Sequence, residues 1–361
     1  MKKSLLWLLV LVLSISMVTV FSLASCKKAE EVVAPAEEEE VVEEEAPVEE
    51  EAVEKEVEEE GYTFGFVFGV DDPFYTTMQK GTQEKADELG INVIFQTPEK
   101  WAVDVQTPII ESLVARGDID LLVVVPVDTE AMIPVLKKVY DKGIPIITVD
   151  GFLGDGDYSD DKPGSFCLTY IGSDNFDGGL AGGEALAEMV DYKGKAYCEV
   201  ALAGVKGQED RLEGFKAGIS NYPEMEIVGW NYCDNDPDKA QANTRATLEK
   251  DPDMAVIFGC NVFSAQGAAM AVENLGYKGE IKVGAFDATE FAIEKLKEGL
   301  FQMVLAQLPG EMGSLAIECG YKYLENSEEP SIRIKTGFEV FTEGNVNDPE
   351  MQKYVYKGTS E

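Results

Sequence analysis

The sequence contains no histidine among its 361 residues. That absence removes the side chain that most often serves as a general base or a metal ligand in enzymes. Basic residues are also scarce, because 30 Lys and Arg face 68 Asp and Glu and give a net charge of −38. Proteins that bind nucleic acids need basic surfaces to neutralise phosphates. The composition therefore argues against a nucleic-acid partner and against histidine-based catalysis.

Metal, phosphate and thiol sites also lack their usual patterns. The five cysteines beyond residue 160 show no CxxC pair and no zinc spacing, so we expect small buried side chains, with a Cys198–Cys233 disulfide as the less favoured alternative. The acidic run 234–238 is followed by Lys239 where a calcium loop needs glycine. The glycines of 178–183 do not follow GxGxxG spacing, so close helix packing explains them better. We expect no metal and no cofactor.

The N-terminus has the pattern of an export signal. Two lysines precede an apolar run from Leu5 to Leu23, and Leu-Ala-Ser-Cys occupies residues 23–26. This ending resembles a bacterial lipoprotein cleavage box, in which Cys26 becomes the lipidated first residue. We therefore expect residues 1–26 to be a lipoprotein signal peptide, with an uncleaved membrane anchor as the alternative. Either would hold the protein at the outer side of a bacterial membrane.

A low-complexity acidic segment follows the signal. Residues 27–60 hold 17 Glu against three Lys, so this segment alone carries a net charge of −14. Such a composition cannot bury enough apolar surface to fold, and its like charges keep it extended. We expect a disordered tether that spaces the body of the protein from the membrane.

From Tyr62 onward, apolar runs typical of buried strands alternate with amphipathic helical patterns. This order predicts parallel sheets with right-handed crossovers, and its repetition after an irregular stretch at 151–164 predicts two similar α/β lobes facing a cleft. The expected strands are 63–70, 92–95, 121–125, 145–149, 167–171, 195–201, 226–232, 254–258, 281–286, 301–306 and a strand-like run at 333–341. The expected helices are 74–89, 103–115, 130–141, 178–190, 211–219, 238–250, 264–275, 290–298 and 312–324.

The first strand leads into a stretch that combines carboxylates with two aromatic rings. Asp71 or Asp72 can cap the next helix, Pro73 suits its first turn, and we expect Phe74 and Tyr75 to be exposed there. Ligands bind at the carboxyl ends of the strands in open α/β sheets. A carboxylate that accepts from hydroxyl groups, beside a ring that covers a C–H face, suits a sugar. A capped helix with two packed aromatic residues is the alternative.

Seven short motifs follow one another along the chain: Asp72–Tyr75, Pro126–Asp128, Ile146–Asp150, Tyr170–Asn175, Arg211–Phe215, Val283–Asp287 and Ala306–Pro309. In this order and spacing they resemble the periplasmic sugar-binding proteins of the ribose, galactose and xylose group, the binding components of ABC importers. The resemblance covers nearly all of residues 62–345. LacI-type repressors share the fold, but they carry a DNA-binding headpiece where this chain has its cleavage box and tether.

The resemblance implies an α/β fold of two Rossmann-like lobes with parallel sheets, joined by crossing segments near 171–174, 306–308 and 337. The hinged lobes would close around one monosaccharide, either a pentose, a hexose or a related polyol. A monomer, held to the membrane by its lipid alone, would deliver this sugar to a permease and its ATPase. The implied lobes are 62–172 with 308–336, and 173–307 with 337–361.

The resemblance also assigns roles to side chains that follow the predicted strands. Carboxylates would accept hydrogen bonds from sugar hydroxyls, the guanidinium and amide groups would donate them, and the two rings would cover a sugar face. The implied ligand-binding residues are Asp72, Phe74, Tyr75, Asp150, Arg211, Asn235, Asn261, Asp287 and Gln307.

Each role has a structural alternative. An aspartate after a strand can cap a helix instead, although no obvious helix start follows Asp150 or Asp287. The guanidinium of Arg211 can pair with Glu209 or Glu213 at the surface. These readings stay open on the sequence alone.

The sequence departs from the family pattern at two places. Asn235 stands where the second lobe often supplies an aromatic residue, and Val125 stands where the ribose-binding pattern has an asparagine. Ribose itself is therefore in doubt. Trp101 or Phe263 could supply the missing ring, although Phe263 would more often be core packing.

Three functions remain to be compared. Capture of a neutral sugar for import fits the carboxylates spread over both lobes. A carbohydrate-active enzyme could use paired carboxylates, but the chain lacks histidine, a GxSxG elbow and a P-loop. A sensory subunit that docks on a receptor would share all features of the binding module, so the sequence does not separate these two.

Overall fold

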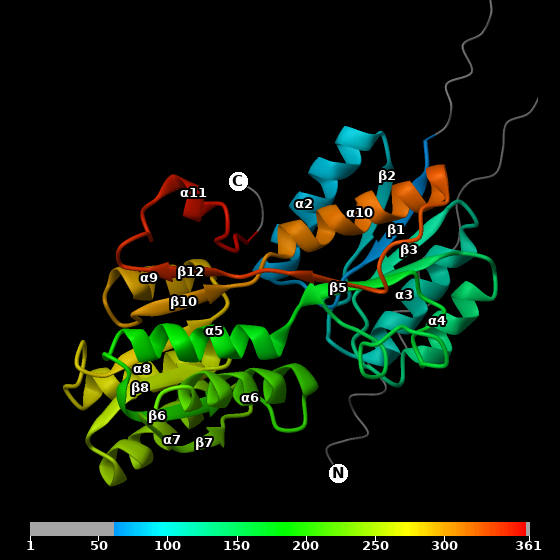
Figure 1. Cartoon of the computed structure of the whole chain (residues 1–361). Helices are drawn as coiled ribbons and strands as arrows, with labels where there is room; N and C mark the ends of the chain where they lie inside the picture. The colour runs from blue at the N-terminus through cyan, green and yellow to red at the C-terminus, as the bar shows by residue number, and fades with distance from the viewer. Residues whose placement is uncertain (1–60, 359–361) are drawn as a thin grey trace, which may run out of the picture. The chain divides into compact units, whose positions relative to one another are not determined.

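The computed structural model of the chain describes residues 61–358. In these residues, the predicted alternation of strands and helices is confirmed and forms two six-stranded sheets with the same internal strand order (Figure 1). The predicted signal peptide, Cys26 and the acidic tether lie outside the described residues. Within the described part, no helix combines the length and apolar character that crossing a membrane requires.

The first sheet is parallel throughout and has the order β11-β5-β4-β3-β1-β2. Helices α2 and α10 pack side by side on one face, and α3, α4 and the loop 151–164 cover the other (Figure 1). The strands are β1 (Thr63–Val67), β2 (Asn92–Gln96), β3 (Leu121–Val124), β4 (Ile146–Val149), β5 (Thr169–Ser173) and β11 (Arg333–Thr336). The helices are α2 (Pro73–Leu89), α3 (Val103–Ala115), α4 (Ile133–Tyr140) and α10 (Pro309–Asn326).

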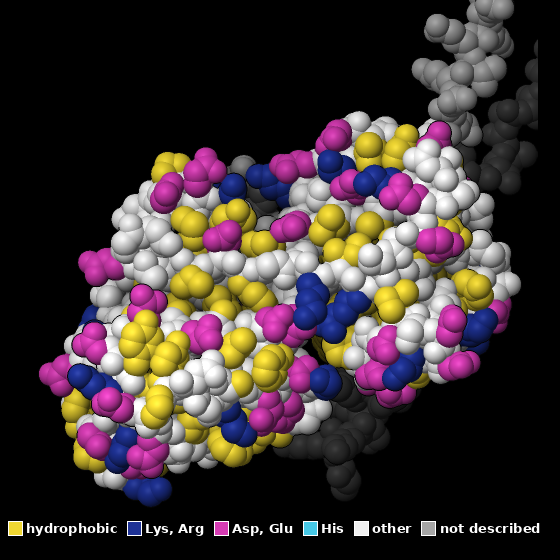
Figure 2. All heavy atoms as spheres, in the orientation of Figure 1, with side chains coloured by type: hydrophobic (Ala, Val, Ile, Leu, Met, Phe, Trp, Pro, Cys, Tyr) yellow, Lys and Arg dark blue, Asp and Glu magenta, His cyan; other side chains and the backbone are white. Residues whose placement is uncertain are grey.

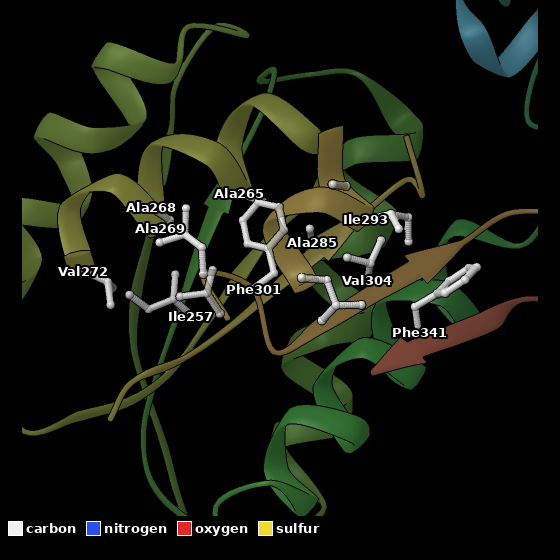
Figure 3. Packing of buried hydrophobic residues seen from close by; sticks show 14 of the residues in the cluster. Ile257, Ala265, Ala268, Ala269, Val272, Ala285, Ile293, Phe301, Val304 and Phe341 are labelled. Atoms are coloured by element: carbon white, nitrogen blue, oxygen red, sulfur yellow. The ribbon is translucent and has the colours of Figure 1, made fainter. Parts of the chain in front are cut away.

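The second sheet has the order β12-β10-β9-β8-β6-β7. Helices α5 and α6 cover one face, while α7, α8 and α9 cover the other, where the apolar side chains of α8 and α9 interdigitate with those of the strands (Figure 3). The strands are β6 (Lys193–Val200), β7 (Glu224–Tyr232), β8 (Met254–Gly259), β9 (Lys282–Phe286), β10 (Met303–Ala306) and β12 (Glu339–Thr342). The helices are α5 (Asn175–Glu188), α6 (Lys206–Ser220), α7 (Pro237–Lys250), α8 (Val262–Asn274), α9 (Glu290–Lys297) and the short α11 (Pro349–Gln352).

Three segments carry the chain between the sheets: from β5 into α5, from β10 into α10, and from β11 into β12. The third segment corrects two expectations. The strand-like run 333–341 is two strands in different sheets, and β12 runs antiparallel to β10, so the second sheet is not wholly parallel. An antiparallel edge strand is common on an otherwise parallel sheet.

Capping residues decide where several helices begin. Asp72 accepts a hydrogen bond from the backbone N–H of Tyr75 at the start of α2, and Gly90 ends that helix with φ +68°. The helix expected at 130–141 begins later, at Ile133, because Asp128 accepts from the backbone N–H groups of Glu130 and Ala131 and holds them in a turn. The strand expected at 167–171 lies two residues later, at Thr169–Ser173.

Glycines allow α5 and α6 to approach closely, as the sequence predicts. A side-chain carbon at Gly179 would lie 2.0 Å from the carbonyl oxygen of Arg211, and one at Gly183 would lie 2.8 Å from that of Phe215. Any larger residue would therefore separate the two helices. Because Arg211 lies on α6, this packing also fixes the position of its side chain relative to the end of the second sheet.

The five cysteines of the described residues are unpaired, and all except Cys319 are buried. The sulfur of Cys198 lies 3.4 Å from that of Cys260, not beside Cys233. Figure 2 shows acidic and basic side chains interspersed over the face in view, which therefore offers no broad basic surface of the kind that nucleic-acid binding needs.

Candidate functional site

Two aspartates occupy equivalent places in the two sheets. Asp150 follows β4 and Asp287 follows β9, and each adopts the left-handed backbone region, with φ +57° and +77°. The backbone N–H of Asp150 still donates to a carbonyl of β5, and that of Asp287 donates to a carbonyl of β10. This conformation is strained for a residue with a side chain and is typical of functional sites. Neither aspartate caps a helix.

The hydroxyl group of Tyr75 donates to Oδ2 of Asp150 at 2.7 Å. The expectation that Tyr75 is exposed is wrong, because its side chain is 5% exposed and packs against Phe68. Burial raises the pKa of Asp150 to about 6, although the bond from Tyr75 and the attraction of Arg211 offset part of that effect. One oxygen of a partly desolvated carboxylate is thus occupied, and the other remains as an acceptor.

Three more aromatic rings form a row of contacts that passes through Tyr75. Trp101 is 49% exposed and stacks on Tyr75, with ring centroids 6.3 Å apart and an angle of 26° between the planes. Gly69 lets the indole lie against the backbone, since a side-chain carbon there would lie 2.1 Å from the ring. Phe74 meets Tyr75 edge to face and meets Tyr356, from the chain's last described segment, in the same way. The rings offer an apolar face beside an acceptor, which suits a sugar.

Arg211 on α6 is held in the second half of the site, not at the surface. It is 8% exposed, its Nε donates to Oδ1 of Asn175 at 2.8 Å, and its Nη1 donates to the carbonyl oxygen of Cys260 at 2.8 Å. Its guanidinium lies 3.6 Å from the centroid of the Phe286 ring. These contacts fix the plane of the guanidinium. The alternative pairing with Glu209 or Glu213 is not present.

Asp287 is surrounded by donors. Nε2 of Gln307 donates to its Oδ1 at 2.8 Å, and Nη1 of Arg211 lies 3.6 Å from its Oδ2. Gln307 is 4% exposed and directly follows β10, at one of the three crossings. Its backbone N–H donates to the hydroxyl of Tyr356 at 2.6 Å. A carboxylate, a guanidinium and a carboxamide are thus joined in one network.

Asn235 and Asn261 lie together at the ends of β7 and β8. Nδ2 of Asn261 donates to Oδ1 of Asn235 at 2.8 Å, and Asn235 has φ +58°. Oδ1 of Asn261 accepts from the backbone N–H of Ser264 and completes a capping box with its side chain, so Asn261 is also the N-cap of α8. Asp72 is likewise an N-cap, of α2. The helix-cap interpretation therefore holds for these two residues, and it leaves Nδ2 of Asn261 at the edge of the site.

The two halves lie within electrostatic range of each other. Burial raises the pKa of Asp72, and the carboxylate of Asp287 from the other sheet raises it further. The guanidinium of Arg211 acts on the pKa of Asp150, again across the two sheets. The nine residues predicted from the sequence therefore gather at the carboxyl ends of both sheets, where the crossings also lie.

Sequence reasoning gave no role to two contributors to this arrangement and offered a third only as an option. Asn175 was part of a motif but had no role, and Tyr356 lies in a tail without any pattern that marks it. Trp101 was only an option, and no periodicity in its loop places it against Tyr75. Phe263, the other option for the missing ring, does not pack in the core and is 48% exposed. The described residues contain no cluster of three or more side chains suited to hold a metal ion.

A family model described as "Periplasmic binding protein domain" matches residues 64–328. The chain belongs to this family. Its two sheets form the type I periplasmic binding protein fold. Family membership confirms the resemblance found in the sequence, and the type of fold predicted there.

Several binding proteins of transport systems are similar over most of the chain. An ABC transporter solute binding protein from Agrobacterium vitis, bound with alpha-D-tagatopyranose, is 36% identical, with a TM-score of 0.74 and coverage of 82% of this chain and 99% of its own. One from Actinobacillus succinogenes, with bound D-allose, is 28% identical, with a TM-score of 0.70 and coverage of 80% and 99%. The ribose import binding protein of Haemophilus influenzae is 29% identical over 275 residues, which are 76% of this chain and 89% of that protein.

These relatives are named as binding proteins of transport systems, and their family acts outside the cytoplasm. The expectation that the chain is a binding protein and not an enzyme is therefore confirmed. The periplasmic binding protein family also accounts for the absence of histidine, because capture of a ligand needs no general base.

Proposed function

We propose that this chain is the substrate-binding lipoprotein of an ABC sugar importer. It captures one neutral monosaccharide between its two lobes and delivers it to a permease and its ATPase. The observation that carries the proposal is the joint arrangement of Asp150 beside Tyr75 in one half and Arg211 beside Asp287 in the other. Each half alone offers an incomplete set of hydrogen bonds, and a polyol between them would use both.

The ligand class follows from the groups available. Phe74, Tyr75 and Trp101 provide ring faces, and the asparagines, Gln307 and the carboxylates provide donors and acceptors for hydroxyl groups. Arg211 is already engaged with Asn175, Cys260 and Asp287, which leaves little positive charge for an anionic ligand. The relatives named above carry tagatose and allose or import ribose. A pentose, a hexose or a related polyol fits this site.

The lobes would comprise residues 62–172 with 308–336, and 173–307 with 337–361. Apart from Ser173, the last residue of β5, the strands of each sheet fall within one of these sets, and the three chain crossings lie at or near their boundaries. Closure would rotate one set against the other about the crossings. Residues 1–26 would be removed at Cys26, and the lipid on that cysteine together with residues 27–60 would tether the body to the membrane.

Thermal unfolding against a panel of sugars tests the proposal. A ligand that binds only the folded state at 100 times its dissociation constant stabilises it by about 2.7 kcal/mol, which for about 300 residues raises Tm by about 4 °C. The panel is D-tagatose, D-allose, D-ribose, D-arabinose and D-fucose, with sorbitol and glucose 6-phosphate for comparison. We expect a shift with one or two neutral monosaccharides and none with the phosphate ester. No shift with any sugar, in folded and ligand-free protein, would contradict the proposal.

A further inference from the structure

A fully buried carboxyl group lies behind the second half of the site without a cation bound to it. Glu199 on β6 is 0% exposed. Both of its oxygens accept from neutral donors: the hydroxyl of Tyr197 donates to Oε2, and Nδ2 of Asn243 donates to Oε1 at 2.8 Å. Lys239 attracts it from a distance, but its ammonium group pairs with Asp234 instead. Such a group is costly to bury, and the binding function described above does not use it.

The two residues that donate to Glu199 also bond to the residues just before one loop of the site, residues 233–235. Nδ2 of Asn243 is also 3.4 Å from the carbonyl oxygen of Tyr232, the last residue of β7. The hydroxyl of Tyr197 accepts from Nδ2 of Asn231 at 2.9 Å. The carboxyl group thus anchors, through one intermediate on each side, the two residues just before the loop 233–235.

The backbone around Glu199 also bonds to a second loop of the site, residues 260–261. The carbonyl oxygen of Glu199 accepts from the N–H of Cys260 at 2.9 Å, and that of Ala201 accepts from the N–H of Asn235 at 3.3 Å. Cys260 in turn holds Arg211 through its carbonyl oxygen, and Asn261 follows it in sequence. One strand end therefore supports Arg211, Asn235 and Asn261 together.

We propose that Glu199 is a positioning residue for the ligand site: its carboxylate holds the loop 233–235, and with it Asn235 and Asn261, in the binding arrangement, and its protonation loosens that loop. The effect on affinity rests on the proposed function. The effect on the loop does not.

The hydrogen-bond inventory explains why protonation matters. The surroundings of Glu199 are all donors, which suits a carboxylate. A proton on Oε1 would face the amide N–H of Asn243, and relieving that clash by turning the amide would place its oxygen against the carbonyl of Tyr232. A proton on Oε2 would face the oxygen of Tyr197, and the hydroxyl proton of Tyr197 would lose its acceptor. In the first case a buried bond that supports the loop is lost, and in the second a buried donor beside the loop is left unpaired.

The pKa of Glu199 places its protonation near neutral pH. Burial raises the pKa of Glu199 to about 7, because its hydrogen bonds and the attraction of Lys239 offset only part of the desolvation. The other titratable groups within electrostatic range of it are the hydroxyl of Tyr197 and the thiols of Cys198 and Cys233, and burial raises the pKa of all three. They stay neutral while the carboxyl group changes state.

The first test compares full chains carrying Glu199→Gln and the native residue by calorimetry with D-tagatose between pH 5 and pH 8.5. Asp150 also titrates near pH 6 in both proteins, so the ratio of the two Kd values cancels its contribution. Loss of about one hydrogen bond predicts that the variant binds about fivefold more weakly at pH 8.5. We expect the ratio to fall to about 1 at pH 5, where the native carboxyl is protonated. The matched control, Glu249→Gln at an exposed ion pair, should give a ratio near 1 throughout.

Stability and affinity should change in opposite directions. A raised pKa means that the folded state binds the proton more tightly, so the contribution of Glu199 to stability is lost as pH rises through about 7. Affinity should instead increase over that interval. A carboxyl that only supported the fold would alter the pH dependence of Tm and leave the Kd ratio flat, which would overturn the proposal.

The second test needs no ligand. The readout is hydrogen exchange at the amides of Cys233 and Asn235, whose N–H groups donate to the carbonyl oxygens of Val200 and Ala201. On acidification, the protection of these amides relative to their intrinsic exchange rate should fall. Glu199→Gln should show the faster opening at every pH. Tyr197→Phe, which keeps the carboxyl group but removes one donor, should move the native transition to higher pH. Equal protection of this segment in all three proteins would overturn the proposal, even if D-tagatose failed to bind and the proposed function alone were wrong.

Discussion

Asp150 and Asp287 occupy the same position in two sheets of the same strand order, yet their surroundings differ. Each follows the third strand from the β11 or β12 edge, with a positive φ and a backbone N–H bonded to the next strand. Asp150 receives one hydrogen bond, from an aromatic hydroxyl, and burial raises its pKa to about 6. Asp287 receives a bond from Gln307 and lies 3.6 Å from a guanidinium nitrogen.

The difference teaches how one scaffold can supply two kinds of contact. The first half bonds its carboxylate to a tyrosine that packs among other rings and leaves it poorly solvated, so it offers an apolar face and an acceptor whose charge depends on pH. The second half surrounds its carboxylate with fixed donors, so its geometry is set before a ligand arrives. Preorganised donors lose less entropy on binding than mobile ones. The second half should therefore contribute most of the affinity, and the first half should select the ligand's apolar face.

The largest expected effect comes from breaking the second half at Arg211. In Arg211→Lys a single ammonium group cannot reach both Asn175 and the carbonyl oxygen of Cys260, which Nε and Nη1 now bind. Loss of about two charge-assisted bonds should weaken binding about hundredfold, measured by calorimetry with whichever sugar raises Tm. Arg245→Lys, at an exposed pair with Glu249, is the matched control and should bind normally. A Kd within threefold of the native value would contradict the central role assigned to the guanidinium.

Exchanging each carboxylate for its amide sharpens the comparison. Asp287→Asn removes the negative charge beside Arg211 and places an amide N–H group against either Arg211 or Gln307, which are also donors. The variant should therefore have a lower Tm and an affinity about tenfold weaker.

Asp150→Asn can still accept from Tyr75. Because the folded state holds the proton of Asp150 more tightly than the unfolded state, native stability falls as pH rises from about 4 to about 6.

Asp150→Asn should therefore have a higher Tm than the native protein at pH 8 and an equal one near pH 4. Scanning calorimetry of both amide variants over this range measures the difference. If Asp150→Asn lowered Tm at pH 8 as much as Asp287→Asn, the two aspartates would be equivalent and the contrast between the halves would fail.

Particular residues show what the sequence could and could not reveal about the fold. The apolar run of β1, the cap at Asp72 and the stop at Gly90 act locally, and the predicted elements there agree with the structure to within three residues. The run 333–341 has one β-like pattern, but its split between two sheets depends on the partners β5 and β10, which lie far away in sequence. Strand propensity does not report which sheet a segment joins.

The candidate site shows the same limit of prediction from local sequence patterns. Polar residues at strand ends could be found because all parallel strands present their carboxyl ends on one side. The bond from Tyr75 to Asp150 spans 75 residues, and the support of Gln307 by Tyr356 spans 49. No local pattern encodes such pairs. The buried network around Glu199 was invisible for a similar reason, since a glutamate inside a strand looks like an edge or solvent-facing position until its neighbours are known.

Tyr75→Phe makes the smallest change and examines the first half alone. The hydroxyl of Tyr75 lowers the pKa of Asp150, so its removal should raise that pKa above about 6 and leave the ring in place. Native affinity for a neutral sugar should fall as pH drops through about 6, because a protonated carboxyl group is a poorer acceptor. In the variant this fall should begin at higher pH, with binding about threefold weaker at pH 7 and nearly unchanged at pH 8.5. Tyr140→Phe, at an exposed ring, should leave the pH profile unchanged. An identical profile in Tyr75→Phe and the native protein would mean that the tyrosine acts only through its ring, and that the acceptor strength of Asp150 is set by burial and Arg211.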